Sequence, residues 1–166
     1  GRVVITAGFS ETGAEGRALE EQLRERVRKA GIRLIGPNCM GVFNTAADIR
    51  LDATFSPTPP LPGSIGFVSQ SGALGVAVLN LAAGLGLGLT QFASMGNKAD
   101  VSGNDLLEYW EDDPATRVIC MYLESFGNPK RCTEIAKRVS RKKPILVVKS
   151  GRTEEGARAA SSPLLS

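Results

Sequence analysis

The sequence predicts an α/β protein built on parallel β-sheets with flanking helices, and three observations lead to this fold class. Short apolar runs alternate with longer stretches in which apolar residues recur at helical spacing, the pattern of βαβ units. Glycine, proline and serine mark the joints between these stretches. Hydrophobic residues make up 42% and charged residues 22% of the 166 residues, as in a globular protein with a substantial core.

The N-terminal part of the chain carries one such unit. Residues 3–9 are predicted to form a strand, residues 15–29 an amphipathic helix, and residues 33–37 a second strand. Residues 46–62 then lose periodicity and gather prolines at positions 57, 59, 60 and 62. This stretch is therefore expected to contain a linker between two domains.

The rest of the chain alternates regularly. Strands are expected at 65–69, 90–95, Val118–Leu123 and Ile145–Lys149, and helices at 73–85, 104–111 and 129–141. Right-handed crossovers make such strands parallel, and ligands of such sheets bind at the carboxyl ends of the strands. Glycines 84, 86 and 88 follow a helix rather than a strand, so they are expected to end that helix and not to bind a dinucleotide.

Composition and charge disfavour several classes of protein. The net charge of +3 is mild, and the basic residues at 24–29 and 137–143 share helical patterns with acidic and apolar residues, which favours solvated helix faces over a nucleic-acid site. No apolar run approaches the roughly 20 residues of a membrane span. Cys39, Cys120 and Cys132 lack metal-ligand spacing, so we expect no metal site and reduced thiols in a cytoplasmic protein.

The chain contains no histidine. A Ser-His-Asp or Cys-His mechanism, a histidine-ligated metal and a histidine relay within this chain are therefore excluded. The serine-rich turn that follows residues 65–69 also lacks the Gly-x-Ser-x-Gly spacing of a nucleophile elbow, and it lacks the lysine of a P-loop.

That turn is the first candidate site. An apolar strand runs through Ser69, Gln70 and Ser71 directly into a helix that begins near Gly72 and Ala73. Free N–H groups at a helix start, the positive end of the helix dipole and two hydroxyl groups suit a phosphate or a similar anion. Gly72 would let the anion approach without a Cβ in the way. The alternative is that Ser69 or Ser71 only caps the helix.

Two further strand-end loops carry charged side chains. Glu124 stands where the apolar strand Val118–Leu123 meets its outgoing loop, a place where a carboxylate can orient a donor or act as an acid or base. A solvated carboxylate, or one that caps the turn at Asn128, fits the sequence equally well. Lys98 lies in the loop 96–103, which either places its ammonium group near an anion or is an ordinary exposed loop.

Four motifs in order resemble one family. They are Gly36-Pro37-Asn38-Cys39, the turn Ser69-Gln70-Ser71-Gly72-Ala73-Leu74, the loop Gly96-Asn97-Lys98 and the segment 151–162, and together they cover nearly the whole chain. The sequence is similar to the NDP-forming acyl-CoA synthetases, which comprise the ADP-forming acetate–CoA ligases and the related succinyl-CoA synthetase α subunit.

The resemblance implies a division of the chain and an activity. Residues 1–56 would be the end of a Rossmann-like CoA-binding domain, residues 57–62 a proline-rich linker, and residues 63–166 a flavodoxin-like CoA-ligase domain. In the family, acyl-CoA and phosphate give an acyl phosphate, and the phosphoryl group then passes through a phosphohistidine to ADP or GDP, all reversibly. ATP or ADP and magnesium would belong to a separate ATP-grasp domain or β subunit.

Roles for individual residues follow from the same resemblance. The residues implied at the phosphate of the phosphohistidine are Ser69, Ser71, Gly72 and Ala73. Glu124 matches the catalytic glutamate that contacts that histidine. Thr6 and Ala7, together with Ile5, would lie beside CoA.

The sequence departs from the family at its end, because Pro163-Leu164-Leu165-Ser166 stands where the phosphorylated histidine is expected. The glycine loop for CoA, expected before Gly1, is also missing. We therefore expect a piece of a cytoplasmic, oligomeric acid–thiol ligase that is inactive by itself. Two alternatives are a ligase-like regulatory domain fused to a GNAT domain in a bacterial protein lysine acetyltransferase, and a CoA- or phosphate-binding module without chemistry.

Overall fold

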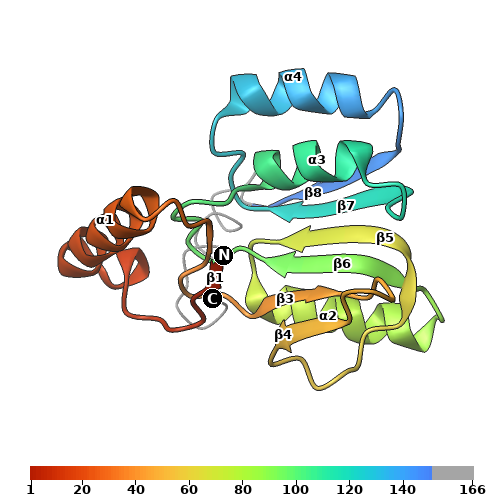
Figure 1. The fold of residues 1–166 in the computed structure, drawn as a ribbon, viewed down its shortest axis with the longest axis horizontal. Helices are drawn as coiled ribbons and strands as arrows, with labels where there is room; N and C mark the ends of the chain where they lie inside the picture. Colours follow the sequence, from red (N-terminus) through yellow and green to blue (C-terminus); the bar gives the residue numbers. More distant parts are fainter. Residues whose placement is uncertain (151–166) are drawn as a thin grey trace.

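The computed structural model describes residues 1–150, in which two β-sheets of different size are flanked by helices (Figure 1). The smaller sheet pairs β1 (Arg2–Val3) with β2 (Leu34–Ile35) in parallel. The strands of the larger sheet are β3 (Gly41–Asn44), β4 (Leu51–Thr54), β5 (Pro62–Ser69), β6 (Leu89–Ser94), β7 (Val118–Leu123) and β8 (Ile145–Lys149). The helices are α1 (Ala14–Lys29), α2 (Gly72–Gly84), α3 (Gly103–Asp112) and α4 (Pro129–Val139), with a short 3₁₀ turn, η1, at Ser10–Thr12.

The strand order of the larger sheet is β4-β3-β6-β5-β7-β8, and β5 to β8 are all parallel. Counted from β5, the parallel strands follow the flavodoxin-like order 2-1-3-4. The chain moves from β5 to β6 on one side and then crosses to β7 on the other, so the topological switch point lies between β5 and β7. Ligands of open α/β sheets bind at the carboxyl ends of the strands that flank such a point.

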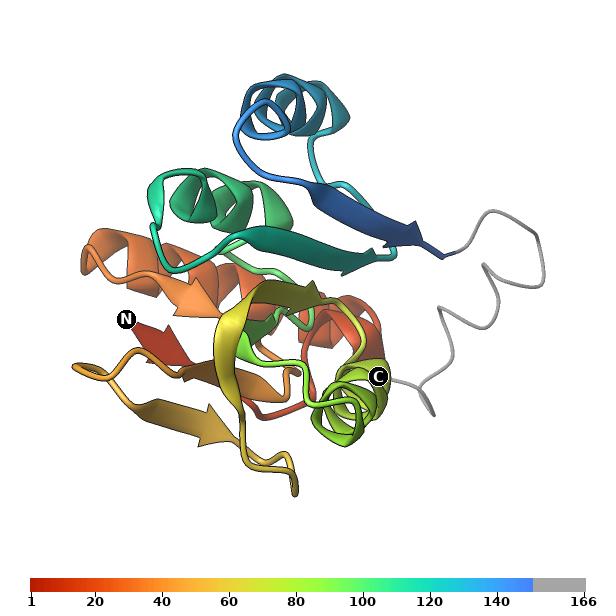
Figure 2. The same cartoon turned by 90° about the vertical axis from the view of Figure 1, so that its right-hand side faces the viewer.

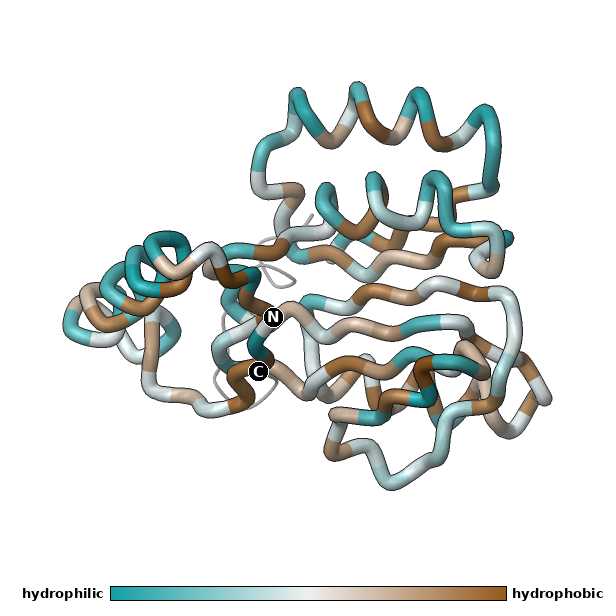
Figure 3. The backbone as a smooth tube through the Cα atoms, in the orientation of Figure 1, coloured by the Kyte–Doolittle hydropathy of each residue, from teal (hydrophilic) through white to brown (hydrophobic). Residues whose placement is uncertain are grey.

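Side chains of the central strands alternate between two apolar cores, as expected for a sheet that is covered on both faces. Phe67 of β5 packs in a core with Leu79 of α2, whereas the neighbouring Val68 packs in a core with Trp110 of α3 and Ile135 of α4. Helices α3 and α4 therefore cover one face and α2 the other, an arrangement that is visible when Figures 1 and 2 are compared. Figure 3 shows that the outer side of α4 is hydrophilic, whereas its side toward α3 and the sheet is hydrophobic.

A third, smaller core joins α1 to the two-stranded sheet. It contains Val27 of α1, Leu34 of β2 and Ala99 of the loop after β6. The contribution of Ala99 ties this part of the chain to the larger sheet at the carboxyl end of β6. The two sheets thus meet where the loops that carry the candidate motifs also lie.

Sequence reasoning located the helices and the four parallel strands of the larger sheet, and β7 and β8 match their predicted bounds. The prediction that glycines 84, 86 and 88 end a helix is confirmed, because α2 ends at Gly84 and Gly86 has a positive φ of 66°. Within residues 1–150, no helix combines the length and apolarity needed to cross a bilayer.

The strand expected over residues 3–9 is wrong beyond its first residue. The chain turns at Gly8, which has a φ of 103°. The Glu11 carboxylate accepts the N–H groups of Gly8 at 2.5 Å and Phe9 at 3.0 Å, so these groups are bonded within a turn rather than in a sheet.

The prediction that residues 46–62 lack regular structure is also wrong. Strand β4 lies within this stretch and pairs antiparallel with β3, which in turn pairs antiparallel with β6. The larger sheet therefore draws strands from both sides of the proline-rich segment at 57–62. The division into residues 1–56 and 63–166 stays a prediction, but β3 and β4 belong to the same sheet as the strands that follow.

Candidate anion site at the end of β5

The turn from β5 into α2 is held by the two serines. Ser71 adopts an extended conformation as the N-cap of α2, and its Oγ accepts the N–H of Leu74 at 3.3 Å. The hydroxyl of Ser69, which is fully buried, donates to the carbonyl oxygen of Ser71 at 2.6 Å. Ser71 therefore caps α2, and Ser69 fixes the shape of the turn through its bond to the Ser71 carbonyl.

Capping leaves the first helical N–H groups available. The N–H of Gly75 bonds to the carbonyl of Ser71 at 3.0 Å, so the intrahelical ladder begins there. The N–H groups of Gly72 and Ala73 precede that ladder and point out of the helix start, where the dipole is positive. A Cβ on Gly72 would stand 3.7 Å from the Cβ of Met40, an ordinary contact, so packing does not require glycine at this position.

The end of β7 is joined to this turn by Gln70. Its backbone N–H donates to the carbonyl of Tyr122 at 3.0 Å, which extends the pairing of β5 with β7. Its side-chain oxygen accepts the N–H of Glu124 at 2.7 Å and the N–H of Ser125 at 2.9 Å. The helix start and Glu124, which were separate candidates in the sequence, therefore lie together at the switch point between β5 and β7.

Lys98 reaches the same loop from the end of β6. Its ammonium group donates to the Oγ of Ser125 at 2.5 Å and to the carbonyl of Ser125 at 3.4 Å. The backbone at Lys98 is left-handed, with a φ of 57°, and the side chain is half-buried rather than freely exposed. Burial lowers the pKa of Lys98, and the Glu124 carboxylate acts in the opposite direction.

Glu124 is half-buried between two lysines. Burial raises the pKa of its carboxyl group, and the ammonium groups of Lys98 and of Lys149, at the end of β8, lower it by a smaller amount. The upward direction of the net shift means that the charged carboxylate is less well solvated here than in the unfolded chain. Such a carboxylate is suited to accept a proton or a hydrogen bond from an incoming group.

This shift predicts a pH-dependent effect of the Glu124→Gln substitution. A carboxyl group whose pKa is higher in the folded than in the unfolded chain destabilises the fold once it ionises, so the penalty is absent below about pH 4 and develops as the pH rises through the folded-state pKa. We therefore expect Glu124→Gln to have a higher free energy of unfolding than the parent chain at pH 7, with the difference shrinking toward pH 4. Urea unfolding at both pH values measures it. A variant that is less stable at pH 7 contradicts the sign.

The Gly36-Pro37-Asn38 turn and the Gly96-Asn97-Lys98 loop are in direct contact. The N–H of Asn97 donates to the carbonyl of Pro37 at 3.0 Å, and the side-chain amide of Asn38 donates to that of Asn97 at 3.3 Å. The N–H of Asn38 in turn donates to the carbonyl of Thr6 at 3.0 Å. The exposed Thr6 and Ala7 therefore approach this junction from the end of the smaller sheet rather than from the helix start of α2.

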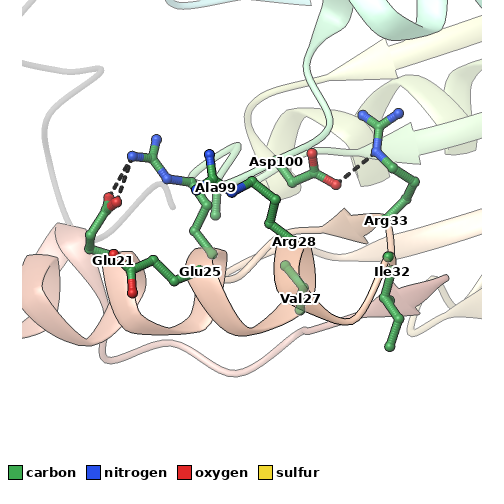
Figure 4. Close-up of a pocket in the computed structure, with 10 residues that line it drawn as sticks. Glu21, Glu25, Val27, Arg28, Ile32, Arg33, Ala99 and Asp100 are labelled. Carbon is green, nitrogen blue, oxygen red and sulfur yellow. Dashed lines mark hydrogen bonds and ion pairs between the residues drawn. The ribbon is translucent and has the colours of Figure 1, made fainter.

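A charged cavity of about 610 Å³ lies beside the same junction, between α1 and the loop after β6 (Figure 4). Its lining includes Glu21, Glu25, Arg28, Arg33 and Asp100. The Asp100 carboxylate accepts the Nε of Arg33 at 2.9 Å and the N–H of Leu34 at 2.8 Å. Because acidic and basic groups alternate in its wall, the cavity selects no one sign of charge, and Asp100 serves to anchor the loop to β2.

Sequence reasoning missed the roles of Gln70, Ser125 and Lys149. Gln70 carried a signal, since it is a long polar residue between two serines at the end of an apolar strand. Ser125 and Lys149 carried none, because their proximity to Lys98 and Glu124 depends on the order of the strands.

A parallel sheet in flavodoxin order, with a capped helix start, a half-buried carboxylate and a lysine at its switch point, defines a flavodoxin-like domain suited to an anionic ligand. The chain belongs to the family of succinyl-CoA ligase-like flavodoxin domains. The profile described as "Succinyl-CoA ligase like flavodoxin domain" matches residues 62–164.

Relatives of known activity match beyond those residues. The α subunit of the ADP-forming acetate–CoA ligase I of Pyrococcus furiosus is 49% identical over 96% of this chain and 34% of its own length. The ADP-forming acetate–CoA ligase of Methanocaldococcus jannaschii is 46% identical over 98% of this chain and 22% of its own length. The chain thus spans about a third or less of these relatives. Their names give no support to the acetyltransferase alternative.

A solved structure has the same fold. It is the dinucleotide-forming acetyl-coenzyme A synthetase 1 of Ca. Korarchaeum cryptofilum in complex with phosphate and ADP. It superimposes with a TM-score of 0.88 at 45% identity, over 96% of this chain and 34% of that one.

Proposed function

We propose that this chain is the phosphate- and CoA-handling part of an ADP-forming acid–thiol ligase. The observation that carries the proposal is the meeting of the α2 helix start with Glu124 at one switch point, through the hydrogen bonds of Gln70. The names of the relatives, which are acetate–CoA ligases, support the reaction class. The related synthetase was solved in complex with phosphate and ADP, which supports phosphate as the anion.

The proposed roles follow from the chemistry of each group. The N–H groups of Gly72 and Ala73, with the helix dipole, hold the oxygens of a phosphate or phosphoryl group. Glu124 accepts a hydrogen bond from the imidazole of a histidine that lies elsewhere in the protein, since this chain contains none. That bond orients the ring so that its other nitrogen faces the phosphoryl group. Lys98 balances the added negative charge.

CoA is proposed to bind near Thr6 and Ala7, at the junction of the two sheets. Both residues are exposed, and the backbone of Thr6 is fixed by its bond to Asn38. Nucleotide and magnesium are assigned to an ATP-grasp domain or β subunit, and a complex with such a partner is part of the proposal. A relative that is named as a subunit α supports this assembly.

A phosphate titration of the 166-residue chain tests the anion site. We expect the amide resonances of Gly72 and Ala73 to shift in a saturable way with inorganic phosphate, because their N–H groups become hydrogen-bond donors to the ligand. Sodium chloride at matched ionic strength is the control and should leave them nearly unchanged. Equal shifts in both salts, or none in either, would overturn the assignment of phosphate to this turn.

The ligase reaction is tested on the polypeptide that carries this chain together with its histidine and ATP-grasp parts. We expect ATP to form only when acetyl-CoA, phosphate and ADP are all present, whereas the 166-residue chain alone should form none. Phosphate binding without ATP formation in the complete protein would favour a binding module without chemistry.

A further inference from the structure

Gln70 occupies an unusual position for an uncharged polar side chain. It is 9% exposed and lies between the two serines that shape the start of α2. Within the amide group only the oxygen accepts hydrogen bonds, so the side-chain oxygen faces the backbone of Glu124 and Ser125, at 2.7 and 2.9 Å. Both hydroxyls beside it are already used within their own turn.

The loop after Glu124 is anchored at its far end, where Asn128 caps α4 and its carbonyl accepts a bond from the side-chain amide of Asn104 at 3.4 Å. Residues 125–128, which follow Glu124, are exposed, and Gly127 adopts a positive φ of 67°. Among the described residues, the side-chain bonds to Ser125 come from Gln70 and from Lys98. The place of Glu124 relative to the α2 helix start is therefore set through Gln70, and Lys98 is anchored to the same peptide.

We propose that Gln70 is a positioning residue for phosphoryl transfer, which clamps the Glu124–Ser125 backbone beside the N-terminus of α2 so that Glu124 and Lys98 face the bound anion. The inference rests on the proposed function for its phosphate ligand. The clamp itself rests on the two hydrogen bonds alone.

The chemistry of the side chain explains why an amide serves here. A glutamate at position 70 would offer the same acceptor oxygens, but it would place a negative charge next to the anion and next to Glu124. An asparagine would keep the amide, but it is one methylene shorter and would not reach both N–H groups. The variants Gln70→Glu and Gln70→Asn therefore separate the clamp from the charge of the group that forms it.

Hydrogen exchange of the 166-residue chain measures the clamp. We expect Gln70→Ala and Gln70→Asn to speed exchange of the Glu124 and Ser125 amides by about tenfold, as the loss of a hydrogen bond predicts, and Gln70→Glu to keep them protected. The Ile119 amide within β7 should not change in any variant. Gln91→Ala is the matched control, since it removes a half-buried amide on β6 whose oxygen accepts the indole N–H of Trp110 at 3.0 Å.

The phosphate titration then tests the role of the clamp. We expect the dissociation constant for phosphate to be about three- to tenfold higher in Gln70→Ala and Gln70→Asn. We expect at least the same increase in Gln70→Glu, because this variant keeps the clamp but adds a negative charge that repels the anion. In the two uncharged variants the pKa of the Glu124 carboxyl group should also lie closer to its usual value, because a freed loop exposes the group and moves it away from Lys98 and Lys149. The Gln91→Ala control should resemble the parent chain in both measurements.

The outcomes distinguish the two proposals. Unchanged exchange at Glu124 and Ser125 in Gln70→Ala overturns the clamp, whatever the phosphate result. Faster exchange with unchanged phosphate affinity and unchanged Glu124 titration overturns the positioning role while leaving the anion site standing. A parent chain that binds no phosphate overturns the proposed function, and with it the role of Gln70 in phosphoryl transfer.

Discussion

A Gly72→Asp variant is expected to keep its fold and to lose at least about tenfold in phosphate affinity. The Cβ has room, since its nearest neighbour is the Cβ of Met40 at 3.7 Å. A carboxylate in the first turn interacts favourably with the helix dipole, which contributes about 0.3–1 kcal/mol. The same carboxylate would compete for the N–H groups of the helix start and repel an incoming anion by several kcal/mol at short range.

The control for this variant lies on the same helix. Asn80→Asp adds the same charge on the exposed surface of α2, two turns further along, and keeps the oxygen that accepts the hydroxyl of Thr58. We expect it to bind phosphate nearly as the parent chain does. Urea unfolding and the amide-shift titration measure the two effects. If both variants weaken binding equally, the anion is bound somewhere other than the helix start.

A Gly96→Ala variant is expected to cost about 3 kcal/mol or more of the free energy of unfolding. Gly96 has a φ of 52°, and an added Cβ would stand far inside van der Waals contact with the carbonyl oxygens of Pro37 and Asn38. The left-handed backbone costs a residue with a side chain about 1–2 kcal/mol, and overpacking adds about 1–3 kcal/mol. Both neighbours are backbone atoms, so no side-chain rotation relieves the overlap.

Gly86→Ala isolates the backbone part of that cost. Gly86 has a φ of 66°, close to that of Gly96, but an added Cβ there meets nothing within 4 Å. We expect it to lose only about 1–2 kcal/mol in the same urea experiment. Equal losses for the two variants would mean that the loop 96–98 does not press against the Pro37-Asn38 turn as described.

The helices and parallel strands of this chain were predictable because each is encoded locally. The apolar run Val118–Leu123 forms β7 with those bounds, and the amphipathic pattern at 15–29 forms α1. β3 and β4 were not predicted because each is only four residues long, and because β3 joins the rest of the sheet through its pairing with the distant β6. The β4 strand is mostly exposed and contains aspartate and alanine, which have low strand propensity, so only its register with β3 makes it a strand.

The candidate site was predictable in its parts but not in its assembly. The turn around Ser71 and the carboxylate of Glu124 each carried a recognisable sequence signal. Their meeting depends on the pairing of β7 with β5. The strand that directly precedes β7 in the chain is β6, but β6 lies on the other side of β5. That pairing brings Gln70 next to Glu124, and no sequence pattern within either segment specifies the pairing.

The direction of the parallel strands gives the two ends of the larger sheet different tolerance to engineering. The helix start, the loop 96–98 and Glu124 all lie at the carboxyl ends, whereas the turns after α2 and α3 lie at the opposite end. At the end of α2, Gly84 is exposed, and a Cβ added there would meet nothing within 4 Å. A fluorophore, an affinity tag or new chain termini introduced there would report on the protein while leaving the anion-facing surface undisturbed.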